Sequence, residues 1–243
     1  MSSEAAPSED GAAFVRAARA SDAPSLARIQ VESWRDGLSG LVSDDVLDQL
    51  TSAQALAEWE SRWREAITSP PSSRHRVFVA VTKADPPPSP APSPAPSMSH
   101  RPDSMPVDVT STEGAAGGGA AGGGVAGLMA VGFASAGPAS DEDRWPATDG
   151  QLHELRVLPG HAPENRATGG HASRLLHAVA DTLAEDGFRT LTTWVLEADS
   201  GYREFLAAAG LEPDGARGEL DMGKPLIVLR YVTAIGAYGG EQA

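Results

Sequence analysis

The residues best suited to chemistry lie in one stretch, from Leu152 to Gly187, which reads LHELRVLPGHAPENRATGGHASRLLHAVADTLAEDG. The pattern predicts a strand that ends at Pro159, a glycine-bearing loop, and a helix that starts near Ala172. Such a loop presents backbone N–H groups at a helix N-terminus, where the helix dipole also favours negative charge. Because glycine and alanine let a ligand approach the backbone, the loop is suited to a phosphate or pyrophosphate. The same glycines are equally typical of a plain tight turn.

Other sites that bind phosphate or metal do not fit this loop. A P-loop requires Gly-Lys-Ser/Thr, and the loop contains no lysine. A Rossmann fingerprint requires three spaced glycines, and the third is absent. His161 and His177 are scattered, and no carboxylate stands at a ligand spacing from them, so we expect no metal site.

The rest of the chain predicts the elements that must position this loop. In chain order we expect a strand at 14–18, helices starting at about 21, 43 and 52, strands at 76–81, 126–134 and 152–158, a helix at 173–186, a strand at 190–196, a helix at 202–209 and a strand at 226–232. Antiparallel neighbours come first and strand–helix–strand units follow, which indicates a mixed α/β fold.

Two segments of low complexity interrupt this pattern. Residues 1–11 are polar and predict a disordered tail. Residues 84–125 contain PPPSPAPSPAPS and then GAAGGGAAGGG, and predict a disordered insert. Strands stand on both sides of the insert, so we expect one domain, 12–232, that the insert interrupts, followed by a tail at 233–243. A plain spacer is favoured over a proline-rich ligand for a partner domain.

Composition excludes several classes of protein. The chain has 243 residues and no cysteine, which excludes disulfides, Cys-ligated zinc and a thiolate nucleophile. Its 19 basic and 33 acidic side chains give a net charge of −14, which argues against nucleic acid as a partner. No run of 18 apolar residues predicts a membrane span, and the N-terminus is unlike a signal peptide. We therefore expect a soluble cytoplasmic protein.

The segment Gly170–Leu176, GHASRLL, resembles the second half of an acyl-CoA-binding motif, Gln/Arg-x-x-Gly-x-Gly/Ala, and the helix behind it. That motif belongs to the GNAT superfamily of N-acetyltransferases. The strand before it, and segments upstream and downstream, also resemble the family in order over most of the predicted domain. In this register Ala167 takes the Gln/Arg position, and the loop after Pro159 is longer than usual for the family.

The resemblance implies a mixed, mostly antiparallel sheet of about six to seven strands flanked by helices. It also implies transfer of an acetyl group from acetyl-CoA, without a metal, to a primary amine of a small molecule or a peptide. The residues implied to bind the cofactor are Leu155, Val157, Thr168, Gly169, Gly170, His171, Ala172, Ser173, Arg174, Asp199 and Phe205. His171 would contribute only its backbone, and Asp199 is equally suited to cap the helix at Tyr202.

Catalysis in this family implies a base for the amine proton and an acid or solvent for the thiolate. Glu154 is the only carboxylate in the predicted strand and is our candidate base, and the alternative is an ordinary solvent-facing residue. Strand alternation predicts that His153 points to the opposite face. Leu206 stands where the family often has a tyrosine that protonates the leaving thiolate. Tyr202, one helical turn earlier, is the candidate replacement for this general acid.

The loss of that tyrosine leaves a second function open. The chain would then be an acyl-CoA-binding sensor or scaffold with weak or no transfer. A homodimer is also compatible with the resemblance. Three basic residues near the C-terminus, Arg217, Lys224 and Arg230, are expected to be solvated surface rather than to attract an acidic substrate.

Overall fold

The computed structural model describes residues 13–83, 127–161 and 170–236. The predicted N-terminal tail and the predicted insert at 84–125 lie outside these ranges, as do Thr168 and Gly169 of the loop. The two strands that border the insert are hydrogen-bonded neighbours, with Lys83 paired to Leu128. The chain therefore leaves the sheet and returns to it at one point.

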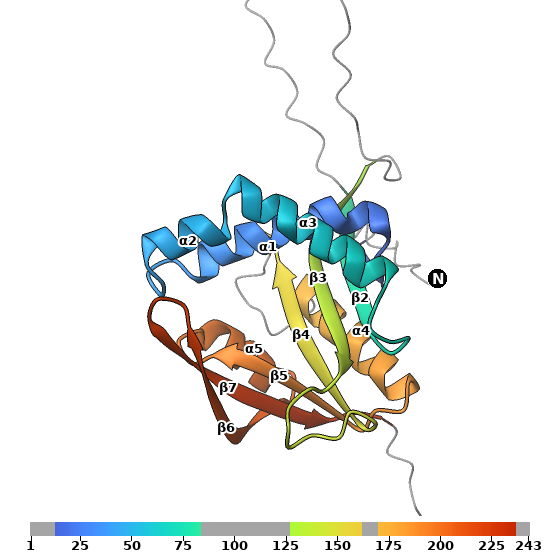
Figure 1. The fold of residues 1–243 in the computed structure, drawn as a ribbon. Helices are drawn as coiled ribbons and strands as arrows, with labels where there is room; N and C mark the ends of the chain where they lie inside the picture. Colours follow the sequence, from blue (N-terminus) through green and yellow to red (C-terminus); the bar gives the residue numbers. More distant parts are fainter. Residues whose placement is uncertain (1–12, 84–126, 162–169, 237–243) are drawn as a thin grey trace, which may run out of the picture.

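A seven-stranded sheet forms the centre of the described structure (Figure 1). The strands are β1 (Phe14–Ala17), β2 (Arg76–Lys83), β3 (Leu128–Pro138), β4 (Asp149–Val157), β5 (Thr190–Leu196), β6 (Glu212–Asp221) and β7 (Pro225–Ala234). Their order is β1-β2-β3-β4-β5-β7-β6, and the described pairs are antiparallel except β4–β5, which is parallel. The predicted mixed, mostly antiparallel sheet is confirmed.

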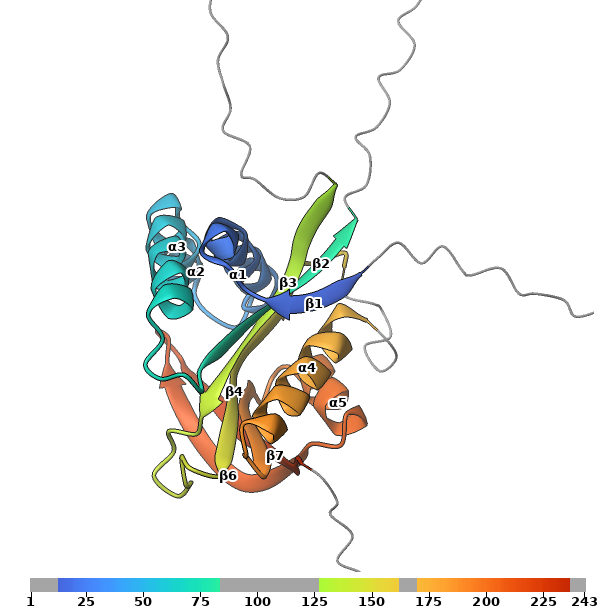
Figure 2. The same ribbon diagram turned by 90° about the vertical axis from the view of Figure 1, so that its right-hand side faces the viewer.

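Helices cover both faces of the sheet (Figure 2). On one face lie α1 (Ala23–Gly37), α2 (Asp44–Leu50) and α3 (Ala53–Thr68), which a short 3-10 turn (Ala20–Asp22) precedes; on the other lie α4 (His171–Glu185) and α5 (Ser200–Ala208). None of the helices in the described ranges is long and apolar enough to cross a membrane.

Each helical layer packs on its own hydrophobic cluster. Leu152, Leu175 and Phe205 belong to the cluster beneath α4 and α5, whereas Ile29 and Phe133 belong to the cluster beneath α1 and α3. Apolar side chains on both faces of the central strands explain why these strands read as nearly continuous hydrophobic runs rather than as alternating ones.

The helix α3 forms largely as its sequence predicts. The Ser52 side chain caps it by accepting a hydrogen bond from the Ala55 backbone N–H at 3.0 Å. Trp63 is buried against Phe133, with ring centroids 4.7 Å apart. Trp59 packs edge-on against Trp34 of α1, at 5.0 Å. The tryptophans thus join α3 to α1 and to the sheet.

The element order predicted from the sequence lacks one strand, β6. Its sequence, EPDGARGELD, has no apolar alternation, and most of its residues are exposed. Because β6 is an edge strand paired with β7 alone, nothing requires a hydrophobic face from it. Backbone hydrogen bonds to β7 therefore define this strand, and the pattern of its side chains does not predict it.

A bulge in β4 overturns the expectation that His153 and Glu154 point to opposite faces. The β3 register passes from Ser135↔Glu154 to Ala136↔Leu152, so His153 has no partner of its own. The His153 ring stacks on the ring of His75. The His75 ring in turn packs against Gly137, on the side of β3 to which a Cβ atom at this glycine would point. Gly137 lies on the same side of β3 as the buried Phe133, beneath α1 and α3. Both His153 and Glu154 therefore face the α1 side.

Arg230 is not the solvated surface residue that its sequence context predicts. Its side chain is 5% exposed, and it bonds to three carboxylates, Asp141, Asp143 and Asp214. Arg144 also pairs with Asp214, and the Trp194 indole donates to Asp141. This Arg230 cluster ties the β3–β4 loop to the β6–β7 hairpin. By contrast, Arg217 is exposed and pairs with Glu197.

Candidate functional site

The sheet opens between its two parallel strands. β4 and β5 pair only from Asp149↔Thr190 to Leu152↔Thr193, although both strands continue beyond these residues. Figure 1 shows the two strands diverging. The Leu158 backbone N–H, next to the end of β4, donates to Val131 of β3 at 2.8 Å. Alternation along β4 then turns the backbone groups of Leu155 and Val157 toward the gap.

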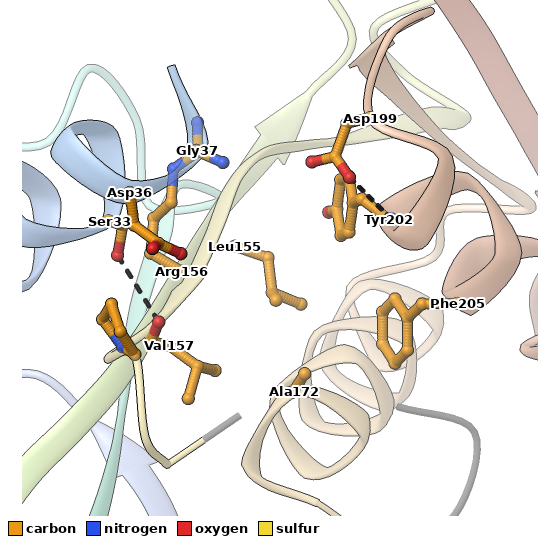
Figure 3. A pocket seen from close by; sticks show the side chains of 11 residues that line it. Ser33, Asp36, Gly37, Leu155, Arg156, Val157, Ala172, Asp199, Tyr202 and Phe205 are labelled. Atoms are coloured by element: carbon orange, nitrogen blue, oxygen red, sulfur yellow. Dashed lines mark hydrogen bonds between the residues drawn. The ribbon is translucent and has the colours of Figure 1, made fainter. Parts of the chain in front are cut away.

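A cavity of about 130 Å³ lies at this gap. It is lined by Ser33, Asp36, Gly37, Leu155, Arg156, Val157, Pro159, Ala172, Asp199, Tyr202 and Phe205. Figure 3 shows Ser33, Asp36 and Arg156 together on the α1 side, with Tyr202 and Phe205 of α5 opposite them. The cavity therefore joins the two faces of the sheet at the point where β4 and β5 separate.

Glu154 is half-buried beside this cavity, near Gln30, Arg156 and Tyr202. Its Oε2 atom is buried and has no hydrogen-bond partner among the described residues. Burial raises the pKa of the Glu154 carboxyl above its usual value and outweighs Arg156 and Gln30, which lower it. Gln30 of α1 is fully buried, and both polar atoms of its side chain lack partners within the described ranges. The Oε2 atom of Glu154 is thus withdrawn from solvent, unlike the carboxylate of an ordinary solvent-facing strand residue.

Tyr202 faces the cavity, whereas Leu206 does not line it. The Tyr202 ring stacks on Phe205, with centroids 5.9 Å apart. Burial raises the pKa of Tyr202 to about 12, with Arg156 and Thr193 acting in the opposite direction. Leu206 is fully buried in the cluster beneath α4 and α5. A phenol so placed keeps its proton at neutral pH.

Asp199 caps α5, which is one of the two roles predicted for it, the other being cofactor binding. Its Oδ1 atom accepts a hydrogen bond from the Tyr202 backbone N–H at 2.8 Å. This bond fixes the start of α5 and hence the position of the Tyr202 ring. Asp199 also lines the cavity.

The N-terminus of α4 reaches the cavity through Ala172. Gly170 is the N-cap residue, with φ −74° and ψ 176°, and His171, Ala172 and Ser173 form the first turn. The amides of such a turn lack partners within the helix. Burial lowers the pKa of His171, and the neighbouring Arg174 and His161 lower it further. Among the described residues, no group of three acidic or histidine side chains is arranged to hold a metal.

The structure brings most of the predicted site residues together. Leu155, Val157, Ala172, Asp199, Tyr202 and Phe205 line one cavity, and Glu154 lies beside it. Gly170, His171 and Ser173 stand at the start of α4 next to Ala172, whereas Arg174 is exposed one turn further on. Thr168 and Gly169 fall outside the described residues.

Sequence reasoning missed the α1 side of the cavity. Ser33, Asp36 and Gly37 come from the last turn of α1, more than 100 residues before the loop, and no local pattern connects them to it. Arg156 was also missed, although the sequence carries a signal for it. It stands two residues after Glu154 in the same strand, and alternation places the two on one face.

Comparisons with known proteins agree with this geometry. No family model matches the sequence, and no curated protein matches it. Among solved structures, the protein yncA of Salmonella typhimurium, determined with its cofactor acetyl-CoA, is 13% identical with a TM-score of 0.50, over 96% of this chain and 99% of that one.

Two further solved structures are similar. The acetyltransferase of GNAT family from Streptococcus pneumoniae is 13% identical with a TM-score of 0.51, over 93% of this chain and 100% of that one. An N-acetyltransferase from Staphylococcus aureus Mu50 has the same identity and TM-score, over 92% and 98%. Together with the seven-stranded sheet that opens between β4 and β5, these likenesses show that the chain has the fold of the GNAT superfamily.

Proposed function

We propose that the protein is an N-acetyltransferase that transfers an acetyl group from acetyl-CoA to a primary amine by direct attack. The observation that carries the proposal is the cavity at the opening of the sheet, with the half-buried Glu154 beside it and the half-buried Tyr202 on its wall. The likeness to yncA, which was solved with acetyl-CoA, supports the choice of acyl donor.

The residues on the α4 and α5 side fit coenzyme A. The backbone of β4 at Leu155 and Val157 is not paired with β5, although the Ser33 hydroxyl donates to the Val157 carbonyl at 3.5 Å (Figure 3). This edge offers the hydrogen bonds of an added strand, which suits the amides of a pantetheine arm. The amides at the start of α4 suit a pyrophosphate. Phe205 and Ala172 supply an apolar wall between these two features.

Acetyl-CoA supplies a thioester whose carbonyl carbon an amine nitrogen attacks, so that a C–N bond forms and the C–S bond breaks. Glu154 takes the proton that the amine loses, directly or through one water. Burial suits Glu154 to this task because it raises the pKa of the carboxyl toward the working pH. Tyr202 donates a proton to the leaving thiolate, or solvent does so.

A second function rests on Leu206. The residue that often supplies the acid in this family is absent here, so an acyl-CoA-binding sensor or scaffold with little transfer is the alternative. A thiol-release assay with acetyl-CoA against a panel of small amines and peptide N-termini separates the two. We expect turnover with at least one acceptor. Tight acetyl-CoA binding without turnover on any acceptor would favour the sensor.

The binding arm of this test uses the N-cap of α4. Gly170 has extended backbone angles that suit Asp and Asn, so both Gly170→Asp and Gly170→Asn should keep α4 intact. Gly170→Asp places a negative charge where the pyrophosphate should bind, and calorimetry should show acetyl-CoA affinity falling at least tenfold, about 1.4 kcal/mol. Gly170→Asn is the neutral control and should lose less. Equal affinity for all three proteins would remove this loop from the site.

A further inference from the structure

We propose that Arg156 binds an anionic group of the acceptor, so that the acceptor is a small amino acid-like molecule with a carboxylate a few bonds from its amine. The proposal rests on the acetyltransferase function proposed above and names its substrate class.

The first observation is that the guanidinium of Arg156 makes no direct ion pair, although it lies near enough to Glu154 to lower the pKa of that carboxyl. No ion pair or hydrogen bond joins its guanidinium to another residue of the described ranges, and its Nε atom is buried without an acceptor. Arg16, Arg76, Arg144 and Arg230 each pair with aspartate, whereas Arg203, like Arg156, has a buried Nε without an acceptor but does not line the cavity. A guanidinium stays charged and has five donors, and the buried Nε–H of Arg156, left without an acceptor, costs free energy that a bound anion recovers.

The second observation is where Arg156 points. It shares a face of β4 with Glu154, and the two Cα atoms are about 7 Å apart because they are two residues apart in a strand. Figure 3 shows Arg156 on the α1 side of the cavity, with Ser33 and Asp36. This is the side away from Ala172 and the start of α4, where the phosphates of the donor are placed. An anion held by Arg156 would therefore belong to the acceptor.

The charges around the α1 side match a zwitterion. Asp36 lines the cavity there, and Glu154 lies beside it, so two acidic groups stand near one free guanidinium. An amine arrives protonated at neutral pH and is attracted by carboxylates, while a carboxylate forms two parallel hydrogen bonds with a guanidinium. A peptide N-terminus lacks a free carboxylate beside its amine and would leave Arg156 unpaired.

Matched acceptors test this substrate class. Leucine and phenylalanine are each compared with the corresponding carboxamide, which removes the charge and keeps the size, and with the decarboxylated amine. We expect kcat/KM for the amino acid to exceed that for its amide by about 10- to 100-fold, the range for two charge-assisted hydrogen bonds. Arg156→Gln should remove this preference by raising KM for the amino acid while leaving the amide unchanged. Arg156→Lys should retain part of it.

An exposed arginine on α3, Arg64, provides the control, and Arg64→Gln should change neither substrate. Calorimetry with leucine in the presence of coenzyme A gives a readout without turnover, and binding by the wild type that Arg156→Gln loses would support the proposal. The proposal would be overturned if amides were acetylated as well as amino acids, while the acetyltransferase function would stand. It would also be overturned if Arg156→Gln weakened only acetyl-CoA binding, or if leucine did not bind at all.

Discussion

At the scale of single residues, the burial of the Glu154 carboxyl affects its suitability as a general base. A general base works best when its pKa lies near the working pH, and burial moves the pKa of Glu154 in that direction. Glu154→Gln keeps the shape of the side chain and removes the base. We expect the rate of acetyl transfer to fall about 10²- to 10⁴-fold near neutral pH, with acetyl-CoA affinity unchanged. Full activity in this variant would exclude Glu154 as the base.

The same substitution should stabilise the fold at high pH. A carboxyl whose pKa is higher in the folded than in the unfolded state favours folding while it is protonated, and loses this contribution as pH rises through the folded pKa. Gln stays neutral at every pH. Glu154→Gln should therefore melt at a higher temperature than the wild type at pH 8, and the difference should shrink toward pH 5. A variant that melts lower at pH 8 would contradict the raised pKa.

Tyr202 permits a weaker prediction because its partner in the reaction needs little help. A coenzyme A thiolate leaves readily on its own, since thiol pKa values lie near 8.5. Tyr202→Phe keeps the ring stacked on Phe205 and removes the hydroxyl. The rate should fall less than about tenfold, and a loss as large as that of Glu154→Gln would give Tyr202 a greater role than we assign it.

At the scale of elements, the Arg230 cluster holds the β3–β4 loop on the β6–β7 hairpin. Hydrogen bonds from Arg230 lower the pKa of Asp143 to about 2, and with the Ala216 N–H they hold the pKa of Asp214 below its usual value, although burial opposes this. Arg230→Met would leave Asp141 and Asp143 without their guanidinium, with Asp214 still paired to Arg144, and the free energy of unfolding should fall by about 2 kcal/mol. The control Arg217→Met removes an exposed pair and should cost under about 0.5 kcal/mol.

Acid titration identifies the cause of that loss. Carboxyls whose pKa is lowered by folding stabilise the protein above their unfolded pKa, near 4, and lose this contribution as pH falls toward 2. The wild type should therefore lose melting temperature between pH 5 and 3. Arg230→Met should lose less over the same range, because Asp143 and Asp214 would no longer depend on the guanidinium. Parallel curves for the two proteins would mean that Arg230 acts through packing alone.

What the sequence could predict depended on whether a signal was local. The start of α3 at Ser52 and the Asp199 cap of α5 arise from neighbours in the chain, and the structure has both. The strand β6 and the bulge at His153 depend on partners in other strands and leave no mark on the local pattern. The role proposed for Asp36 depends on the packing of α1 across the sheet, which no spacing encodes.

At the scale of the whole molecule, the proposed function assigns the two substrates to different helical layers. The α4 and α5 layer presents the features that suit the acyl donor, and the α1 layer presents those that suit the acceptor. The two meet where the parallel pair β4–β5 separates, so one irregularity of the sheet creates the passage between them. Substitutions in the α1 layer should therefore change KM for the acceptor and leave the affinity for acetyl-CoA unchanged, and substitutions at the start of α4 should do the reverse.

The strands that border residues 84–125 are hydrogen-bonded neighbours in the sheet. Lys83 pairs with Leu128 and Thr82 with Met129, so a turn of a few Gly and Ser residues could join β2 to β3. Loop-closure entropy grows only with the logarithm of loop length, and shortening the loop should favour the folded state by no more than about 2 kcal/mol. The shortened protein should keep its activity and melt within a few degrees of the wild type, by calorimetry. A protein that fails to fold would show that the segment packs on the domain and that the single-domain assignment is wrong.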